Sequence, residues 1–176
     1  ESRYKGSMGT SVIKLFDLTA ASVGLTEKAA KDSGYNFESV ILSPSSHAGY
    51  YPGATTMTMK VVFDKSSFQI LGAQIVGYDG VDKRIDVIAT AILAGLKATE
   101  LKDLELAYAP PYSSAKDPVN MAGFIIDNIA SGIVKQFHIN EIDTLPKDGS
   151  GTLLDTRTEK EYSRGHVEGF INIPVD

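Results

Sequence analysis

The stretch at residues 70–92 reads ILGAQIVGYDGVDKRIDVIATAI, and its hydrophobic period changes part-way along. Residues 55–64 and 68–78 are apolar runs separated by residues 65–67, which predicts a hairpin with a short loop. Beyond the hairpin the apolar residues recur at steps of three and four, the period of an amphipathic helix. The charged side chains within residues 82–86 lie mostly off this stripe. The stripe comprises Val81, Ile85, Ile88, Ala91, Ile92 and Leu96.

Upstream of the hairpin, the pattern predicts two strands with a short helix between them. The strands are expected at residues 11–17 and 37–42, because both runs are rich in β-branched and apolar residues. The helix is expected at residues 25–32, where Thr26 can cap its start and Gly34 follows as a stop.

Two further helices are expected downstream. A short one starts near Thr99, where Thr99 and Glu100 supply a cap and a first-turn acid. Asp117 caps a longer one, with Pro118 in its first position. Consecutive strands followed by grouped helices predict an α+β domain at residues 8–135, an antiparallel sheet with helices on one face. The apolar face of the longer helix comprises Val119, Ala122, Ile125, Ile126, Ile129 and Ile133.

Two irregular segments interrupt these elements, at residues 43–53 (SPSSHAGYYPG) and at residues 106–117 (LAYAPPYSSAKD). Their prolines and glycines exclude a regular helix or strand. Segments of this kind turn a corner or carry a site. Together they hold the candidate site residues His47, Tyr50, Tyr51, Tyr108 and Tyr112.

The pattern changes after Gln136. Strand–helix–strand alternation is typical of the start of a parallel α/β sheet, and too few elements follow to close a core. We therefore predict a second, incomplete domain at residues 136–176 that is poorly anchored. The expected elements are strands at 137–139, 152–155 and 170–173 and helical turns at 140–145 and 158–163.

Composition narrows the classes of function. The 176 residues are 43% hydrophobic and 22% charged, which is typical of a folded globular protein. The net charge is −5 and no basic run occurs, which disfavours a nucleic-acid partner. No apolar stretch approaches the length that crosses a bilayer, so we expect no membrane partner and a cytoplasmic protein.

The cysteine count is zero, which excludes disulfides, thiolate metal sites and a cysteine nucleophile within this sequence. We expect no metal site. No GxGxxG fingerprint follows a predicted strand, so a dinucleotide-binding loop is not expected either. The sequence begins at Glu1 rather than at Met, from which we expect it to start within a longer protein.

Four stretches of the sequence form a recognisable set: GTSVIKLFDLTAASVGLTE, SHAGYYPGA, ILGAQIVGYDGVDKRIDVIATAI and LAYAPPYSSAKDPVNMAG. They resemble the C-terminal dimerisation domain of FAD-dependent pyridine nucleotide-disulfide oxidoreductases, and they recur in the family's order over residues 5 to about 130. Within that superfamily they are most similar to the coenzyme A-disulfide reductase and NADH oxidase branch.

The tail, LLDTRTEKEYSRGHVEGFINIPVD, resembles about the first third of a rhodanese domain. A disulfide reductase followed by a rhodanese-like segment resembles the coenzyme A-disulfide or persulfide reductases that carry such a fusion. The residues that match the rhodanese pattern are Asp155, Arg157, Glu161, Gly165, His166, Gly169, Asn172, Ile173 and Pro174.

These resemblances imply a C-terminal fragment of a FAD- and NAD(P)H-dependent coenzyme A-disulfide or persulfide reductase, inactive alone. The longer protein would use FAD, NAD(P)H and coenzyme A, whereas this fragment would hold none of them tightly. It would supply the homodimer interface, and the redox cysteines would lie outside residues 1–176. The alternatives are the C-terminal domain of an NADH oxidase and a purely structural dimerisation module.

The resemblance implies that Tyr50 and Tyr108 reach across the dimer toward the partner's active-site cysteine and bound coenzyme A. A phenol suits that place, because it donates a hydrogen bond to a thiolate without adding charge, and its ring can lie against a pantetheine chain. The alternative is that each tyrosine only packs its loop. The sequence does not separate Tyr50 and Tyr108 from their neighbours Tyr51 and Tyr112.

Other polar residues have two interpretations each. Other branches of the resembled superfamily place a catalytic His in this domain, within a motif that includes an acidic partner, and that arrangement is not seen around His47. The other interpretation of His47 is a loop histidine or a contact to the flavin edge. Lys83 and Arg84 are expected to form ion pairs between helices or subunits, with contact to a coenzyme A phosphate as the alternative. His166 is expected to be structural.

Asp155 and Arg157 are also expected to be structural, with Arg157 free to pair with Glu161.

Overall fold

The computed structural model describes residues 3–4, 6–146 and 148–175. The chain divides into two compact units, Glu1–Lys135 and Gln136–Asp176, and each is described by itself.

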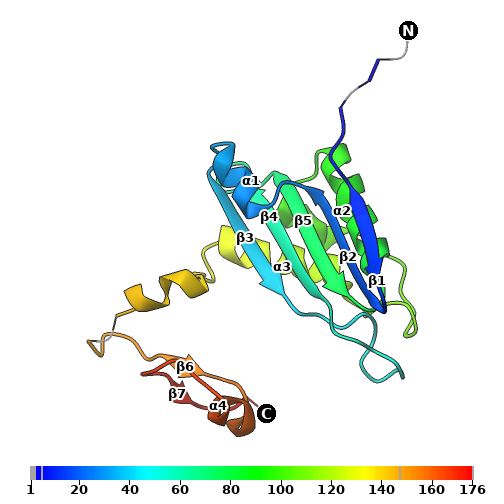
Figure 1. The fold of residues 1–176 in the computed structure, drawn as a ribbon. Helices are drawn as coiled ribbons and strands as arrows, with labels where there is room; N and C mark the ends of the chain where they lie inside the picture. Colours follow the sequence, from blue (N-terminus) through cyan, green and yellow to red (C-terminus); the bar gives the residue numbers. More distant parts are fainter. Residues whose placement is uncertain (1–2, 5, 147, 176) are drawn as a thin grey trace. The chain divides into compact units, whose positions relative to one another are not determined.

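A five-stranded antiparallel sheet is the main layer of the first unit (Figure 1). Its strands stand in the order β1-β2-β5-β4-β3, and every neighbouring pair is antiparallel. The predicted hairpin is confirmed by β4 and β5, in which Val61 pairs with Ala73. The strands are β1 (Ser11–Leu15), β2 (Leu18–Gly24), β3 (Phe37–Leu42), β4 (Thr58–Asp64) and β5 (Ile70–Gly77).

Strand β2 was not predicted, because the strand expected at residues 11–17 runs over a turn. Phe16 and Asp17 form the two-residue connection between Leu15 and Leu18, which pair with each other. Phe16 has a φ of 55°, a conformation in which glycine or asparagine is usual. A Phe-Asp pair therefore carried no turn signal.

Two long helices, α2 (Val81–Ala94) and α3 (Pro118–Ala130), cover one face of the sheet (Figure 1). The predicted α+β class, with an antiparallel sheet and helices, is confirmed. The core lies between these helices and the sheet. It includes Val23, Val40, Met59, Val61, Phe63, Ile75, Ile85, Ile88, Val119, Ala122 and Ile126.

The short helix α1 (Glu27–Asp32) packs on the opposite face of the sheet. Glu27 forms an ion pair with Lys60 at 3.0 Å. Lys60 and Val61 are successive residues of β4, so their side chains point to opposite faces, and Val61 points toward the α2 and α3 side. Thr26 caps α1 as predicted, since its hydroxyl accepts the Ala29 N–H at 3.2 Å.

The starts of the remaining helices differ in how well local sequence predicted them. The 3-10 helix η1 (Ala98–Asp103) begins after Lys97, so the predicted cap at Thr99 is wrong. The Glu100 carboxylate accepts the Lys97 N–H at 2.6 Å and starts the helix earlier. The predicted start of α3 is confirmed, because Asp117 accepts the Val119 N–H at 3.0 Å.

The second unit contains a small parallel pair of strands, β6 and β7, joined through α4. Residues 137–139 form no strand, although a strand was predicted there. The Glu141 carboxylate accepts the His138 N–H at 2.7 Å, which starts a 3-10 helix instead. The elements are η2 (Ile139–Thr144), β6 (Leu154–Asp155), α4 (Glu159–Ser163) and β7 (Ile171–Asn172).

Among the residues described, the longest helix is α2 with 14 residues. No helix there is long and apolar enough to cross a bilayer, which takes about 20 residues.

Candidate functional site

Two irregular loops meet beside the start of α2, although they are far apart in the sequence. We call residues 43–53 the first tyrosine loop and residues 106–117 the second tyrosine loop. The Ala48 N–H of the first loop donates to the Ser113 carbonyl of the second at 3.1 Å. The second loop leads directly into α3. The four candidate tyrosines therefore lie on loops that the fold holds together.

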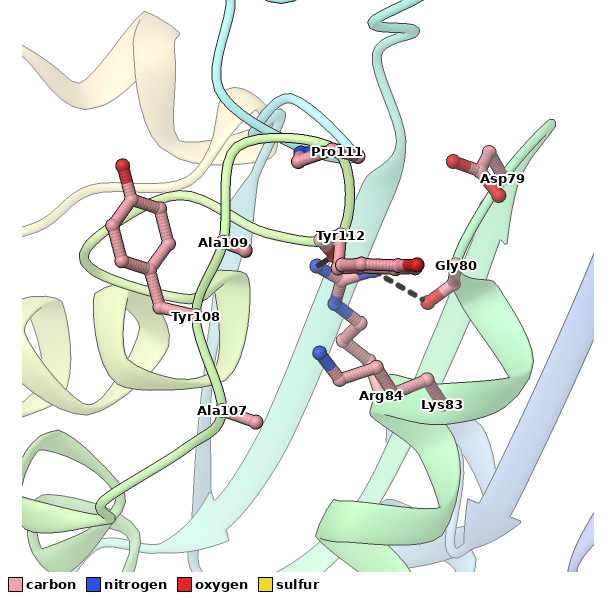
Figure 2. Close-up of a pocket in the computed structure, with 9 residues that line it drawn as sticks. All are labelled: Asp79, Gly80, Lys83, Arg84, Ala107, Tyr108, Ala109, Pro111 and Tyr112. Carbon is pink, nitrogen blue, oxygen red and sulfur yellow. Dashed lines mark hydrogen bonds between the residues drawn. The ribbon is translucent and has the colours of Figure 1, made fainter.

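The structure brings Tyr50 and Tyr108 together and not their neighbours. The hydroxyl oxygens of Tyr50 and Tyr108 are 2.9 Å apart, and both side chains are exposed. Tyr51 instead lies edge-on to His47, with 5.8 Å between ring centroids. Tyr112 is exposed and is turned toward the start of α2 (Figure 2). The sequence could not predict which tyrosines pair, because the two loops meet only in the folded chain.

The hydrogen bond between the two phenols raises the pKa of Tyr108 above its ordinary value, with partial desolvation adding to the effect. A raised pKa favours the protonated, neutral phenol over the phenolate. A phenol is already protonated near neutral pH, so the raised pKa only extends that state to higher pH. The pair can donate a hydrogen bond outward without placing a negative charge there.

A cavity of about 550 Å³ lies between the start of α2 and the second tyrosine loop (Figure 2). Lys83 and Arg84 line it from α2, and Tyr108, Pro111 and Tyr112 line it from the loop. Its volume is within the range of small-molecule sites. Figure 2 shows the Tyr108 ring turned away from Arg84, whereas Tyr112 lies beside the guanidinium group. The cavity is thus lined by two tyrosine side chains and by the side chain of Lys83.

Arg84 closes the inner end of this cavity, and its side chain is 1% exposed. Its Nη2 atom lies 3.0 Å from Oδ2 of Asp117, which confirms the predicted ion pair between helices. The Nη2 atom also donates to the Ser46 carbonyl at 2.8 Å. Arg84 lies off the apolar stripe of α2, so its burial was not predicted. A coenzyme A phosphate could reach it only by displacing these partners.

Lys83 differs from Arg84 although the two are adjacent in α2. Its Nζ atom is 3.9 Å from Asp117, at the limit of an ion pair, and its side chain is more than a third exposed. Lys83 is therefore the cation that a ligand in the cavity can approach.

Comparisons with known proteins agree on the class of this fold. Residues 10–118 match the pyridine nucleotide-disulphide oxidoreductase dimerisation domain. The chain belongs to the pyridine nucleotide-disulphide oxidoreductase family. The coenzyme A disulfide reductase of Staphylococcus haemolyticus (strain JCSC1435) is 46% identical over 121 residues, which are 69% of this chain and 27% of that protein.

Two solved structures resemble the chain over nearly its whole length. Reduced Bacillus anthracis CoADR-RHD matches 99% of this chain and 31% of its own, with a TM-score of 0.91 and 53% identity. The NAD-dependent persulfide reductase from A. fulgidus matches 97% of this chain and 30% of its own, with a TM-score of 0.83 and 39% identity. The chain thus spans less than a third of the length of each relative.

His47 lies inside the dimerisation domain and is 5% exposed. Its ring nitrogens lie 3.1 Å from the Ser46 hydroxyl and 3.4 Å from the Pro52 carbonyl. Asp79 lies 3.8 Å from Nδ1, an acidic neighbour that the sequence pattern did not indicate because it comes from the turn before α2. The flavin-edge role of His47 stays a prediction.

Outside the dimerisation domain, His166 takes part in local packing. Its ring stacks on Tyr162 with 3.8 Å between centroids, and its Nδ1 atom lies 3.1 Å from the Tyr162 carbonyl. These contacts agree with the expected structural role.

Arg157 pairs with Asp155 at 2.6 Å rather than with Glu161. The reason is that the Glu161 carboxylate accepts both the N–H and the hydroxyl of Thr158, the residue that caps the start of α4. The pKa of Asp155 is lowered, chiefly by the hydrogen bond from Arg157.

Within the part of the chain that the structure describes, no group of three or more His, Asp or Glu side chains is placed to hold a metal ion.

Proposed function

We propose that this chain is the dimerisation segment of a FAD- and NAD(P)H-dependent coenzyme A-disulfide or persulfide reductase. In this proposal it forms the homodimer interface and supplies Tyr50 and Tyr108 to the partner's active site. The observation that carries the proposal is the 2.9 Å contact between the phenol oxygens of two tyrosines that are 58 residues apart in the sequence. The similarity to coenzyme A disulfide and persulfide reductases supports the substrate class.

Exposure supports action on a neighbouring subunit. Tyr50 is 77% and Tyr108 47% exposed, so both phenols are open to a second surface. In the phenol pair one hydroxyl donates to the other, which leaves one O–H free to donate outward. A thiolate, or a sulfur that leaves as one, is an acceptor for that hydrogen bond.

The reducing electrons would come from FAD and NAD(P)H through a cysteine outside this sequence, which itself contains none. The part that we assign to this chain is to hold a proton at the phenol pair, in which one hydroxyl donates to the other at 2.9 Å and the second O–H stays available to donate. A departing coenzyme A thiolate would be stabilised by that hydrogen bond as negative charge develops on sulfur.

We further propose that residues 136–176 are the start of a rhodanese-like domain that passes sulfane sulfur in the longer protein. The matching residues from Asp155 to Pro174 support this, as does the structural similarity over 99% of the chain. Without a cysteine these residues cannot carry persulfide sulfur themselves. We place the longer protein in the cytoplasm.

The test is a chimera in which residues 9–130 replace the matching segment of the Staphylococcus haemolyticus coenzyme A disulfide reductase. Reduction of coenzyme A disulfide and consumption of oxygen are measured separately. We expect Tyr108→Phe to lower kcat for the disulfide about 10- to 100-fold, because a donor to developing charge is lost. Tyr50→Phe is expected to act in the same direction. Tyr35→Phe, an exposed tyrosine outside both tyrosine loops, is the matched control with unchanged kcat.

Equal kcat values for Tyr108→Phe and Tyr35→Phe would contradict the role of the phenol pair. Oxygen consumption without disulfide reduction would favour the NADH oxidase alternative. A further test uses the chain itself, by sedimentation and by calorimetric titration with coenzyme A. A dimer without coenzyme A affinity would leave only the assembly role, and a monomer without affinity would contradict both roles.

A further inference from the structure

We propose that Arg84, acting together with Asp117, is the positioning residue that holds the two tyrosine loops in register. This inference rests on the proposed function only because it assumes that Tyr50 and Tyr108 act at the partner's active site. Arg84 itself touches neither phenol, so it acts through the backbone of the loops.

The guanidinium group of Arg84 joins three segments of the first unit. Toward the first tyrosine loop, Nη2 donates to the Ser46 carbonyl at 2.8 Å. Toward the second, Nε donates to Asp117 at 3.2 Å, and Nη2 lies 3.4 Å from the Tyr112 carbonyl. Toward the start of α2, Nη1 donates to the Gly80 carbonyl at 3.1 Å, the bond drawn in Figure 2. One side chain therefore fixes both loops to the same helix.

The residues that Arg84 contacts in the first tyrosine loop lie close to Tyr50 in the sequence. Two residues after Ser46, the Ala48 N–H donates to the Ser113 carbonyl, and the Tyr51 N–H donates to the Ala48 carbonyl at 2.9 Å. The exposed tip that carries Tyr50 thus begins at a point held by Arg84. A shift of one loop against the other at this point would separate the two phenol oxygens.

The second loop is held in the same way at its far end. Asp117 accepts the Ser113 hydroxyl at 2.7 Å and the Val119 N–H at 3.0 Å, in addition to its pair with Arg84. It therefore joins the end of the loop, the start of α3 and the guanidinium group at one buried point. Tyr108 lies on the stretch that leads into this point.

Burial strengthens the contacts of Arg84 and Asp117. Arg84 is 1% and Asp117 2% exposed, and hydrogen bonds between charged groups are stronger where water is excluded. The planar guanidinium donates in several fixed directions, which a lysine ammonium cannot reproduce. Gly80 leaves room for it: its φ is 68°, and an added Cβ would overlap Nη1 of Arg84.

The test uses the whole 176-residue chain and a charge-balanced double variant, Arg84→Met with Asp117→Asn. Removing both charges avoids an unpaired buried ion, methionine fills the space, and asparagine still caps α3. Circular dichroism and thermal unfolding establish that the variant is folded. Carbon-13 NMR of labelled tyrosine then follows the pKa of Tyr108, and amide exchange follows the Ala48 N–H.

We expect the pKa of Tyr108 to fall back toward its ordinary value, and we expect the same when Tyr50→Phe removes the partner phenol. Exchange at Ala48 is expected to rise about tenfold or more, because hydrogen bonds to a charged group are lost at Ser46. Lys83→Met is the matched control: its Nζ atom lies 3.9 Å from Asp117 but donates to neither loop backbone, so it should change both quantities much less than the double variant does.

A folded double variant that keeps both the raised pKa of Tyr108 and the wild-type exchange rate at Ala48 would overturn the proposal. If the double variant does not fold, Arg84→Lys decides: it keeps the charge and loses the fork, so the same two changes are expected in smaller size. Neither readout depends on turnover. If Tyr108→Phe does not change kcat of the chimera, the proposed function is contradicted, whereas the positioning role of Arg84 is not.

Discussion

The two units of the chain differ in the interactions that stabilise them. The first unit buries one face of a five-stranded sheet under α2 and α3, with a continuous core. In the second unit none of the described side chains is buried. Both contain strands and helices with ordinary capping, so the comparison shows that well-formed local elements are not evidence of a core.

The second unit is held by short-range polar contacts instead. The Tyr162 hydroxyl donates to the Phe170 carbonyl at 2.8 Å, and the Asn172 amide donates to the Asp155 carbonyl at 3.0 Å. Such contacts orient a segment, but exposed hydrogen bonds and ion pairs add little stability. The first unit, by contrast, should unfold as one cooperative body.

The largest expected difference between the units is in amide exchange of the unmodified chain. Amides of β4 and β5, such as those of Val61 and Ile75, should exchange only through global unfolding, whose free energy is about 5 kcal/mol or more in a typical domain. Those of Ile171 and Ile173 should exchange about a thousandfold faster or more, because local opening suffices. Exchange measured by NMR checks this, and comparable protection in both units of a monomeric sample would contradict it.

A pair of glycine substitutions sharpens the same comparison. At Gly123 in α3 an added Cβ would overlap the backbone N of Lys102 in η1, so Gly123→Ala is expected to destabilise the first unit by about 1–3 kcal/mol. That loss outweighs the better helix propensity of alanine, about 1 kcal/mol. Gly151→Ala in the second unit is the control, since its Cβ would meet no atom within 4 Å.

Denaturant unfolding followed by circular dichroism measures both variants. A Gly123→Ala protein as stable as the wild type would mean that α3 and η1 do not approach each other as closely as the structure has them.

The smallest expected effect concerns two carboxyl groups. Hydrogen bonds, first from the Ser66 hydroxyl and then from Ser67, lower the pKa of Asp64 from 3.8 to about 2. Because the folded pKa is depressed, the stability from this turn is present above about pH 4 and is lost as the pH falls toward 2. In the Asp64→Asn variant, the free energy of unfolding of the first unit should therefore change less as the pH falls from about 4 toward 2.

Asp155 is the counterpart in the second unit, and its pKa is lowered chiefly by Arg157. Carboxyl carbon-13 titration should place the pKa of Asp155 below 3.8, and Arg157→Gln should raise that pKa toward its ordinary value without changing the pKa of Asp64. Ordinary titration of Asp155 in the wild type would show that even this local contact is not formed in solution.

Local sequence was sufficient wherever neighbours along the chain decide the structure. The β4–β5 hairpin, the apolar stripe of α2 and the start of α3 at Asp117 all depend on residues within a few positions of one another. The same holds for the irregular character of the two tyrosine loops, which prolines and glycines impose. The failures at β2, η1 and residues 137–139 came from turns and caps without their usual residues.

The sequence by itself thus determined the fold class and the two loops on which the tyrosines lie. Only the tertiary structure decided that Tyr50 pairs with Tyr108, that Arg84 is buried, and that Asp79 stands beside His47. The physical reason is that each of these depends on chain segments that meet only after the sheet and helices have packed, and no local pattern records which segments those are.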